Sequence, residues 1–305
     1  MPTRPSAVQL TVTDLDRSID FYRSVIGFRV HERSDGQANL GAGGPTLLQL
    51  VENPSARRVT NHSGLYHFAV LTPTRPALGQ VLRRIVDAQV RLGGSDHSVS
   101  EALYFDDPDG NGIEVYRDRP RSDWQYADGK PLLGNAPLDY RGILNEADGV
   151  GDSLDPDTVI GHVHLHVGQL TPAMNFYIDT VGFDLIMTWQ GRGFLSAGGY
   201  HHHLATNTWA GVEAAPSPRT PWAAATTRLS SPMSRNVRLV ERFDAAGVWR
   251  TKAAAMGCSQ RSGAEWRAVR GQLNRMPKNP PGFRKPGGFS FSSPQSGRVT
   301  QAKAE

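Results

Sequence analysis

The sequence predicts an α+β protein built from repeated modules, each consisting of a strand, a helix and three further strands. The first observation is an internal repeat, in which residues 8–28 recur as residues 163–183 at a constant offset of 155. The second is hydrophobic periodicity, which alternates like a strand and then changes to a helical spacing within each copy. The matching positions are Leu10/Leu165, Val12/Val167, Leu15/Leu170, Phe21/Phe176, Tyr22/Tyr177 and Gly27/Gly182.

The elements of the first two modules follow in order. Each copy of the repeat opens on a strand, continues through a turn into an amphipathic helix, and ends at a glycine that caps the helix. A second module begins at residues 65–71, and the Asp-Pro-Asp-Gly-Asn segment at 107–111 is typical of a turn before its last strand. The other expected elements are strands near 28–34, 37–40, 46–51, 101–106 and 112–117, and a helix near 75–89.

These elements predict four regions along the chain. Residues 6–118 form an N-terminal domain of two modules, and residues 119–157 are a linker rich in Pro, Gly and Asp. Residues 158–207 form a third module, the half of a C-terminal domain that carries a metal site. Residues 208–305 are an atypical basic tail that we expect to be largely disordered, because its composition favours no packed core.

A fourth module would complete the symmetry, but only the segment 236–247 reads as one of its helices. The sequence leaves two explanations open. The tail is a frameshifted reading of a normal fourth module, or it is genuine and the module is degraded.

Composition limits the classes of function. Residues 204–305 hold 16 basic and 5 acidic residues, whereas residues 1–203 hold 17 basic and 24 acidic ones. The single cysteine, Cys258, excludes an intrachain disulfide and favours a reducing, cytoplasmic location. No apolar run has the roughly 18 residues of a membrane-spanning helix. The basic tail lacks a nucleic-acid-binding motif, so we expect neither a membrane nor a nucleic-acid partner.

Histidines indicate where the chemistry lies. All ten lie at or before His203, and His162, His164 and His166 alternate along one expected strand, 159–167. Alternate residues of a strand point to the same face, so these three imidazoles share one side. Burying them is costly unless a metal or an acid–base reaction uses them.

These motifs resemble the vicinal oxygen chelate superfamily, which includes glyoxalase I, bleomycin-resistance proteins and type I extradiol dioxygenases. The resemblance covers residues 6–210 and is closer to two-domain proteins similar to catechol 2,3-dioxygenase. The segments that carry it are Asp14–Tyr22, Tyr66–Ala69, Ser95–Ala102, Asp107–Glu114, Tyr116–Trp124, Ile160–His166, Tyr200–His203 and Asn207–Trp209.

The resemblance implies paired modules that curl into a cup around Fe(II), which is held by two histidines and one carboxylate. One of these metal ligands comes from the first strand of a module. Its position corresponds to His162 in the third module and to Ala7 in the first. His202 matches the acid–base histidine, and its neighbour His203 is a second candidate for that catalytic role. We expect His67 and Glu114 to be a vestigial pair, because Ala7 breaks their set.

The resemblance also implies a second His ligand and a Glu ligand from module four. The offset of 155 takes His67 to Trp222 and Glu114 to Val269, so neither ligand is found. Glu265 is nearby but lies outside any strand-like pattern.

The implied function is an Fe(II)-dependent extradiol dioxygenase that cleaves a catecholic aromatic with O2. The two missing ligands leave open whether the chain as written binds iron and is active. The alternative is a non-catalytic protein that binds an aromatic ligand, as bleomycin-resistance members do. A glyoxalase-like isomerase is disfavoured by Ala7 and by the two-domain layout. The sequence does not identify the aromatic compound, and a homo-oligomer is compatible with it.

Overall fold

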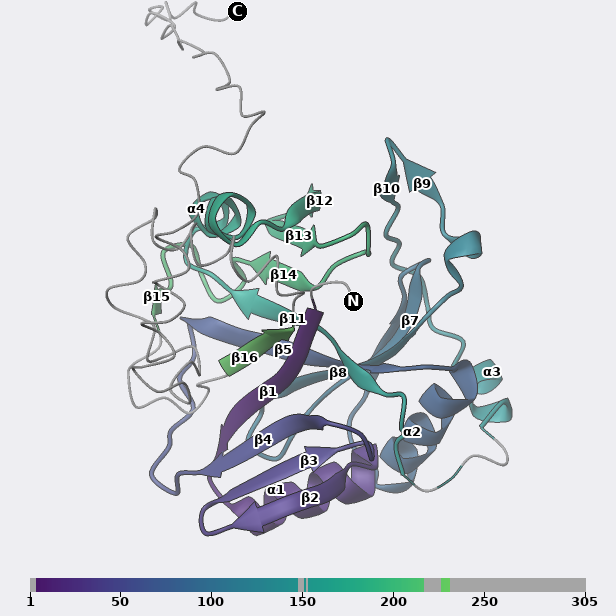
Figure 1. The fold of residues 1–305 in the computed structure, drawn as a ribbon, viewed down its shortest axis with the longest axis vertical. Helices are drawn as coiled ribbons and strands as arrows, with labels where there is room; N and C mark the ends of the chain where they lie inside the picture. The colour runs from purple at the N-terminus through teal and green to yellow at the C-terminus, as the bar shows by residue number, and fades with distance from the viewer. Residues whose placement is uncertain (1–3, 148–150, 152, 217–225, 231–305) are drawn as a thin grey trace, which may run out of the picture. The chain divides into compact units, whose positions relative to one another are not determined.

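Three modules share one strand order in this computed structural model, which describes residues 4–147, 151, 153–216 and 226–230 (Figure 1). In each module the first strand lies parallel to the last strand of the same module. The first module consists of β1 (Arg4–Val12), α1 (Leu15–Phe21), the π-helix η1 (Tyr22–Ile26), β2 (Arg29–Ser34), β3 (Gln37–Gly41) and β4 (Thr46–Glu52). The second consists of β5 (His62–Thr72), α2 (Arg75–Asp87), β6 (Gly93–Asp96), β7 (Ser100–Asp106) and β8 (Gly112–Asp118). The third consists of β11 (Val159–His166), α4 (Leu170–Asn175), the π-helix η3 (Phe176–Val181), β12 (Asp184–Trp189), β13 (Arg192–Ser196) and β14 (Leu204–Asn207). The α+β prediction is confirmed.

The sequence repeat is a repeat of backbone conformation. Asp14 caps α1 by accepting a hydrogen bond from the Arg17 N–H, and the helix widens into η1 before it ends. Gly27 ends this helix at φ 97°, and Gly182 ends η3 in the third module at φ 89°. A glycine is favoured at both places because a side chain is strained at such a φ. The two helix ends therefore redirect the chain into β2 and β12 in the same way.

The Asp-Pro-Asp-Gly-Asn segment forms the expected turn between β7 and β8, and it also ties the first two modules together. Tyr22 donates a 2.9 Å hydrogen bond to the buried carboxylate of Asp107. Asp109 accepts a 2.6 Å hydrogen bond from the Thr13 hydroxyl and pairs with Arg17. Since buried carboxylates are stable only when they are bonded, these contacts fix the turn against the N-terminal end of α1.

The sheets pair the modules differently from the expectation that residues 6–118 form one cup. The larger sheet has the path β12-β13-β14-β11-β5-β8-β7-β6, so it joins the second module to the third through antiparallel β5 and β11. The smaller sheet has the order β16-β1-β4-β3-β2. The physical reason is that each first strand has one edge occupied by its own last strand, and its free edge needs another partner. For β5 that partner is β11, and for β1 it is β16 (Thr226–Ser230).

The region expected to be a linker is more structured than its composition suggests. It contains the 3-10 helix η2 (Arg121–Asp123), the hairpin strands β9 (Tyr126–Ala127) and β10 (Lys130–Pro131), and α3 (Tyr140–Asn145). Arg75 at the start of α2 pairs with Glu101 at 2.9 Å and with Asp139 at 3.2 Å, which holds α3 against the second module. The boundary assigned at residue 118 stays a prediction.

Little of the expected tail is described. Residues 208–216 end in the short strand β15 (Ala215–Pro216), which pairs with β5, and β16 lies along β1 as the first strand of a fourth module would. The remainder of 208–305, including the helix expected at 236–247 and the expected disorder, lies outside the described residues. None of the described helices is both long and apolar enough to cross a membrane.

Gly161 provides a test of this packing. A Cβ at this position would overlap the Tyr116 hydroxyl and lie 2.7 Å from Tyr116 Cζ, and Tyr116 is completely buried. We expect Gly161→Ala to lower the free energy of unfolding by about 1–3 kcal/mol in a denaturant titration, because a packed ring must move. Gly151→Ala is the matched control, since its Cβ would meet nothing within 4 Å. Equal stability of the two variants would contradict the packing described here.

Candidate metal centre and active site

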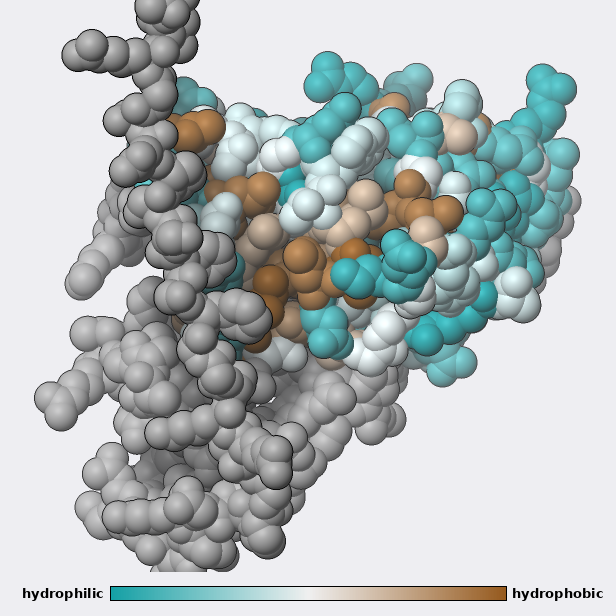
Figure 2. All heavy atoms as spheres, turned by 90° about the horizontal axis from the view of Figure 1, so that it is seen from above, coloured by the Kyte–Doolittle hydropathy of each residue, from teal (hydrophilic) through white to brown (hydrophobic). Residues whose placement is uncertain are grey.

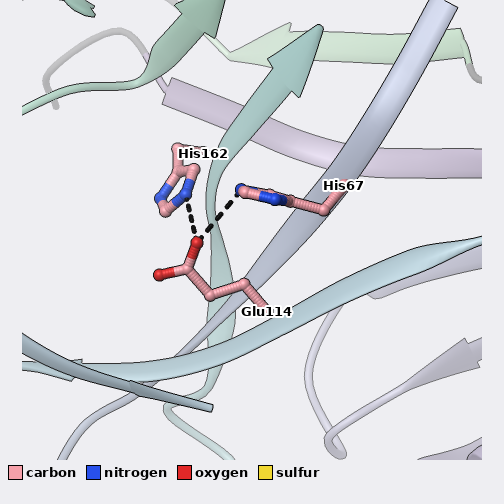
Figure 3. Close-up of side chains that lie close together, drawn as sticks. All are labelled: His67, Glu114 and His162. Carbon is pink, nitrogen blue, oxygen red and sulfur yellow. Dashed lines mark hydrogen bonds and ion pairs between the residues drawn. The ribbon is translucent and has the colours of Figure 1, made fainter. Parts of the chain in front are cut away.

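Three buried side chains converge at the centre of the larger sheet. His67 lies on β5, Glu114 on β8 and His162 on β11, and their ligand atoms all lie within 4.8 Å of one another (Figure 3). The strand register explains this, because Ala69 lies opposite His162 on one side and Glu114 on the other. His67 precedes Ala69 by two residues and so shares its face. The small side chain of Ala69 leaves room between the three larger ones.

The donor atoms are arranged around one point. Nε2 of His162 lies 2.9 Å from Oε2 of Glu114, and Nε2 of His67 lies 3.1 Å from the same oxygen (Figure 3). The second contact does not have hydrogen-bond geometry, so the buried Nε2 of His67 has no hydrogen-bond partner. A buried polar atom without a partner is costly. A divalent cation between the three side chains would satisfy it, so the residues present fit a metal ion bound by two histidines and one carboxylate.

The electrostatics favour the protonation states that a metal requires. Burial raises the pKa of Glu114, but the neighbouring His162 and His67 outweigh this effect and hold that pKa well below its usual value. Burial also lowers the pKa of His67, and it outweighs the opposing effect of Glu114. At neutral pH the pair is therefore a carboxylate beside a neutral imidazole. These are the ligand forms that bind metal without first releasing a proton.

A cavity of about 310 Å³ opens beside this cluster, with His67 and Glu114 in its lining. Its walls are rich in aromatic rings, which suits a flat, apolar ligand. The aromatic side chains that line it are Tyr66, Tyr104, Trp189, Phe194 and Trp209. On the molecular face shown in Figure 2, hydrophobic residues gather in a band with hydrophilic residues on either side.

Comparisons with known proteins agree with this geometry. Residues 4–115 match the profile of the Glyoxalase/Bleomycin resistance protein/Dioxygenase superfamily. The chain is 50% identical over 217 residues to a protein of Bacillus subtilis (strain 168) named catechol-2,3-dioxygenase, which covers 69% of this chain and 76% of the relative. The chain belongs to this superfamily.

Two weaker similarities accompany that match. A virulence protein of Salmonella typhimurium is 29% identical over 113 residues, which cover 35% of this chain and 78% of that protein. The crystal structure of a putative dioxygenase from Bacillus subtilis strain 168 aligns with a TM-score of 0.53 at 14% identity. That alignment covers 80% of this chain and 75% of the other, and it shows a shared fold.

Within this superfamily member, the cluster combines residues that the sequence alone assigned to different domains. His162 was expected to need a histidine and a glutamate from module four. The structure instead places His67 and Glu114 beside it, because β11 pairs with β5. Ala7 belongs to β1 in the other sheet and takes no part. His67 and Glu114, which were expected to be a vestigial pair, are thus two of the three residues of the cluster.

The histidines of the 201–203 run have different surroundings. The ring centroid of His202 lies 4.1 Å from that of His162. His202 and His201 both line the cavity. His203 is not among the residues that line the cavity. Its Nδ1 accepts a 3.2 Å hydrogen bond from the Ala197 N–H, which places it in the connection between β13 and β14. The geometry therefore favours His202 over His203 as the group that faces a ligand.

A chain of hydrogen bonds fixes the orientation of His202. Asp118 accepts a 2.9 Å hydrogen bond from Nε2 of His201, and Nδ1 of His201 lies 2.8 Å from Nδ1 of His202. Because a carboxylate only accepts, Nε2 of His201 carries a proton. In the tautomer with this single ring proton, Nδ1 of His201 accepts from His202. His202 then carries its own proton on Nδ1, and its Nε2 keeps a free lone pair. Burial and the neighbouring His162 and His201 hold the pKa of His202 well below its usual value.

The other two histidines of β11 serve an adjacent network. Asn207 donates to Nε2 of His164 at 2.9 Å and accepts from Nδ1 of His166 at 2.7 Å. His164 lines the cavity, whereas His166 lies further along β11. Burial holds the pKa of His164 well below its usual value, with His67 and His162 acting in the same direction. His164 is therefore a neutral, fixed wall of the cavity.

Two residues of the site carried too weak a signal to be assigned from the sequence. Tyr104 lines the cavity, and its hydroxyl lies 2.8 Å from Nε2 of His97. Nδ1 of His97 donates to the carbonyl of Gly134 at 3.0 Å, so Nε2 is free to accept from Tyr104. Burial and the nearby Glu114 raise the pKa of Tyr104 well above its usual value, so it remains a hydroxyl donor. His97 lies in the Ser95–Ala102 motif, but nothing in that motif indicates Tyr104.

Metal binding tests the cluster directly. We expect His67→Ala and His162→Ala each to weaken binding of Fe(II) or Co(II) by at least about 100-fold, because each removes one of three ligands. Anaerobic calorimetry and metal analysis of the purified protein measure this. His62→Ala is the matched control, because His62 lies on the same strand β5 but outside the cluster. Unchanged metal binding in His67→Ala would show that the cluster is only a buried ion pair.

Proposed function

We propose that this chain is an Fe(II)-dependent extradiol dioxygenase that cleaves a catecholic ring beside its diol, with O2 as co-substrate and a role in aromatic compound catabolism. The observation that carries the proposal is the cluster of His67, Glu114 and His162 at an aromatic-lined cavity. The name of the Bacillus subtilis relative, catechol-2,3-dioxygenase, supports the same reaction.

The donor set suits this chemistry. Two imidazoles and one carboxylate occupy one side of a metal ion and leave positions open on the other. Fe(II) bound there would supply adjacent binding positions for the diol and for dioxygen and would allow charge to pass between them. The cluster is buried at the cavity, so bulk water is kept from the reacting groups.

The chain's own residues handle the ring and the proton. Aromatic walls hold the substrate ring, and neutral His164 and Phe194 limit its position. The free lone pair on Nε2 of His202 can accept a proton from a catechol hydroxyl. The Tyr104 hydroxyl donates its proton to His97, so its oxygen lone pairs can accept a hydrogen bond from a substrate hydroxyl. Acid–base action of His202 is therefore part of the proposal. His203, the second candidate from the sequence, is not among the residues that line the cavity.

The alternative is a cup that binds an aromatic ligand without reacting. The metal cluster distinguishes the two functions, because a protein that only binds an aromatic ligand does not need one. The cytoplasmic location and a homo-oligomeric state remain predictions from the sequence.

Oxygen consumption tests the proposal. We expect the full-length protein, loaded anaerobically with Fe(II), to consume one O2 per catechol and to form a yellow ring-opened product. The Glu114→Gln variant should lose at least about 100-fold in kcat, because the bound metal loses its anionic ligand. An inactive protein that still binds catechol, measured by tryptophan fluorescence, would instead indicate the ligand-binding function.

Asp118 tests the orientation of His202. We expect Asp118→Ala to lower kcat by about 10–100-fold, with KM changed less than about 3-fold and metal content unchanged, because the His201–His202 chain loses its acceptor. Asp118→Asn keeps an acceptor oxygen and should recover most of the rate. Equal rates for Asp118→Ala and the unmodified protein would exclude a positioning role for this chain of hydrogen bonds.

A further inference from the structure

Arg192 brings a positive charge to the wall of the cavity. Arg192 is the one lysine or arginine among the described lining residues, and the one carboxylate among them, Glu114, belongs to the metal cluster. No ion pair joins Arg192 to a carboxylate in the described part of the chain. A permanent positive charge therefore faces an aromatic cavity, and no described residue supplies it with a counter-ion.

The β12–β13 hairpin holds this arginine in place. Gln190 and Gly191 form its two-residue turn with φ values of 45° and 74°, both in the left-handed region. Turns of this kind match the twist of paired strands, so the flanking residues Trp189 and Arg192 lie directly opposite each other. Their side chains consequently share one face of the hairpin.

Two tryptophans enclose the guanidinium group. Its carbon lies 4.6 Å from the ring centroid of Trp189 and 4.8 Å from that of Trp209. Contacts of this type use the faces of the guanidinium plane and leave its edge N–H groups available. The buried Nε has no hydrogen-bond partner among the described residues, and the hydrogen bond from the guanidinium group to Gln190 is long at 3.4 Å.

A continuous row of rings connects Arg192 with the metal cluster. Trp209 lies 5.3 Å from Tyr66, and Tyr66 lies 5.0 Å from His67, measured between ring centroids. A ligand whose diol lies at the cluster would thus extend along aromatic surfaces toward a cation. An edge of a fixed guanidinium group matches the two oxygens of a carboxylate.

We infer that Arg192, held between Trp189 and Trp209, is a carboxylate-binding subsite, and that the substrate is a catechol with a carboxylate-ended substituent. This inference rests on the proposed function and narrows it from catecholic aromatics to anionic ones. Arg192 binds and orients the substrate, and takes no part in ring cleavage.

The test compares two ligands that differ in charge, (3,4-dihydroxyphenyl)acetate and its methyl ester. With the Fe(II)-loaded full chain, we expect the carboxylate to have a kcat/KM at least about 10-fold above that of the ester. Arg192→Met should lower kcat/KM for the carboxylate by about 10–100-fold, mainly through KM, and change that for the ester less than about 3-fold. Arg192→Lys keeps the charge but not the paired N–H donors of the guanidinium group. Its kcat/KM for the carboxylate should lie between the values of the unmodified protein and of Arg192→Met.

The matched control is Arg121→Met. Arg121 also lies over a tryptophan, 5.3 Å from the centroid of Trp124, but it is not among the residues that line the cavity. We expect this variant to treat both ligands as the unmodified protein does. If Arg192→Met lowers kcat/KM for the carboxylate and for the ester to the same extent, the inference is overturned. Arg192 would then only stabilise the hairpin. Equal preference of the unmodified protein for the two ligands would also overturn it.

A binding measurement separates this inference from the proposed reaction. Quenching of tryptophan fluorescence reports ligand binding under anaerobic conditions, whether or not O2 is ever consumed. A charge preference that disappears in Arg192→Met would support the subsite even if the protein proves inactive as a dioxygenase. Turnover of catechol without any charge preference in binding would support the reaction and refute the subsite.

Discussion

The antiparallel pairing of β5 with β11 is the constraint on which the site depends. Strand pairing sets which side chains share a face, and a slip of one residue would turn each of them to the opposite face. The observed register places His162 across from Ala69, and the parallel pairing of β5 with β8 places Glu114 across from the same residue. A donor set from three strands is therefore assembled by backbone hydrogen bonds alone. The small side chain at position 69 keeps the centre of that set open.

Polar groups behind the rings keep the site in a single arrangement. His97 is anchored by the Gly134 carbonyl, His201 by the Asp118 carboxylate, and His166 by Asn207. Each anchor occupies one ring nitrogen and so decides the role of the other. Burial also lowers the pKa values of His67, His164 and His202, so these three imidazoles can lie close together in neutral form without mutual repulsion.

The described part of the site lies before most of the basic C-terminal region. Among the described residues, every member of the cluster precedes residue 163, and the last residue of the cavity lining is Trp209. The change from an acidic to a basic composition near residue 204 thus falls at the end of the site. Within the described part, the later residues contribute β15, which pairs with β5, and β16, which pairs with the free edge of β1. An exposed edge strand invites association with other chains, so this pairing protects the smaller sheet.

The sequence by itself determined the modules, because period-two and helical patterns and glycine caps are local signals. The helix end at Gly27 and its copy at Gly182, the turn at Asp107, and the shared face of His162 and His164 all followed from such signals. Only the tertiary structure decided which modules pair, because the free edge of a first strand carries no code for its partner. Counting along the chain assigned His67 and Glu114 to a different cup from His162, while the β5–β11 pairing unites them. Residues that are isolated in the sequence, such as Tyr104 and Arg192, acquire a role from neighbours that only the folded chain supplies.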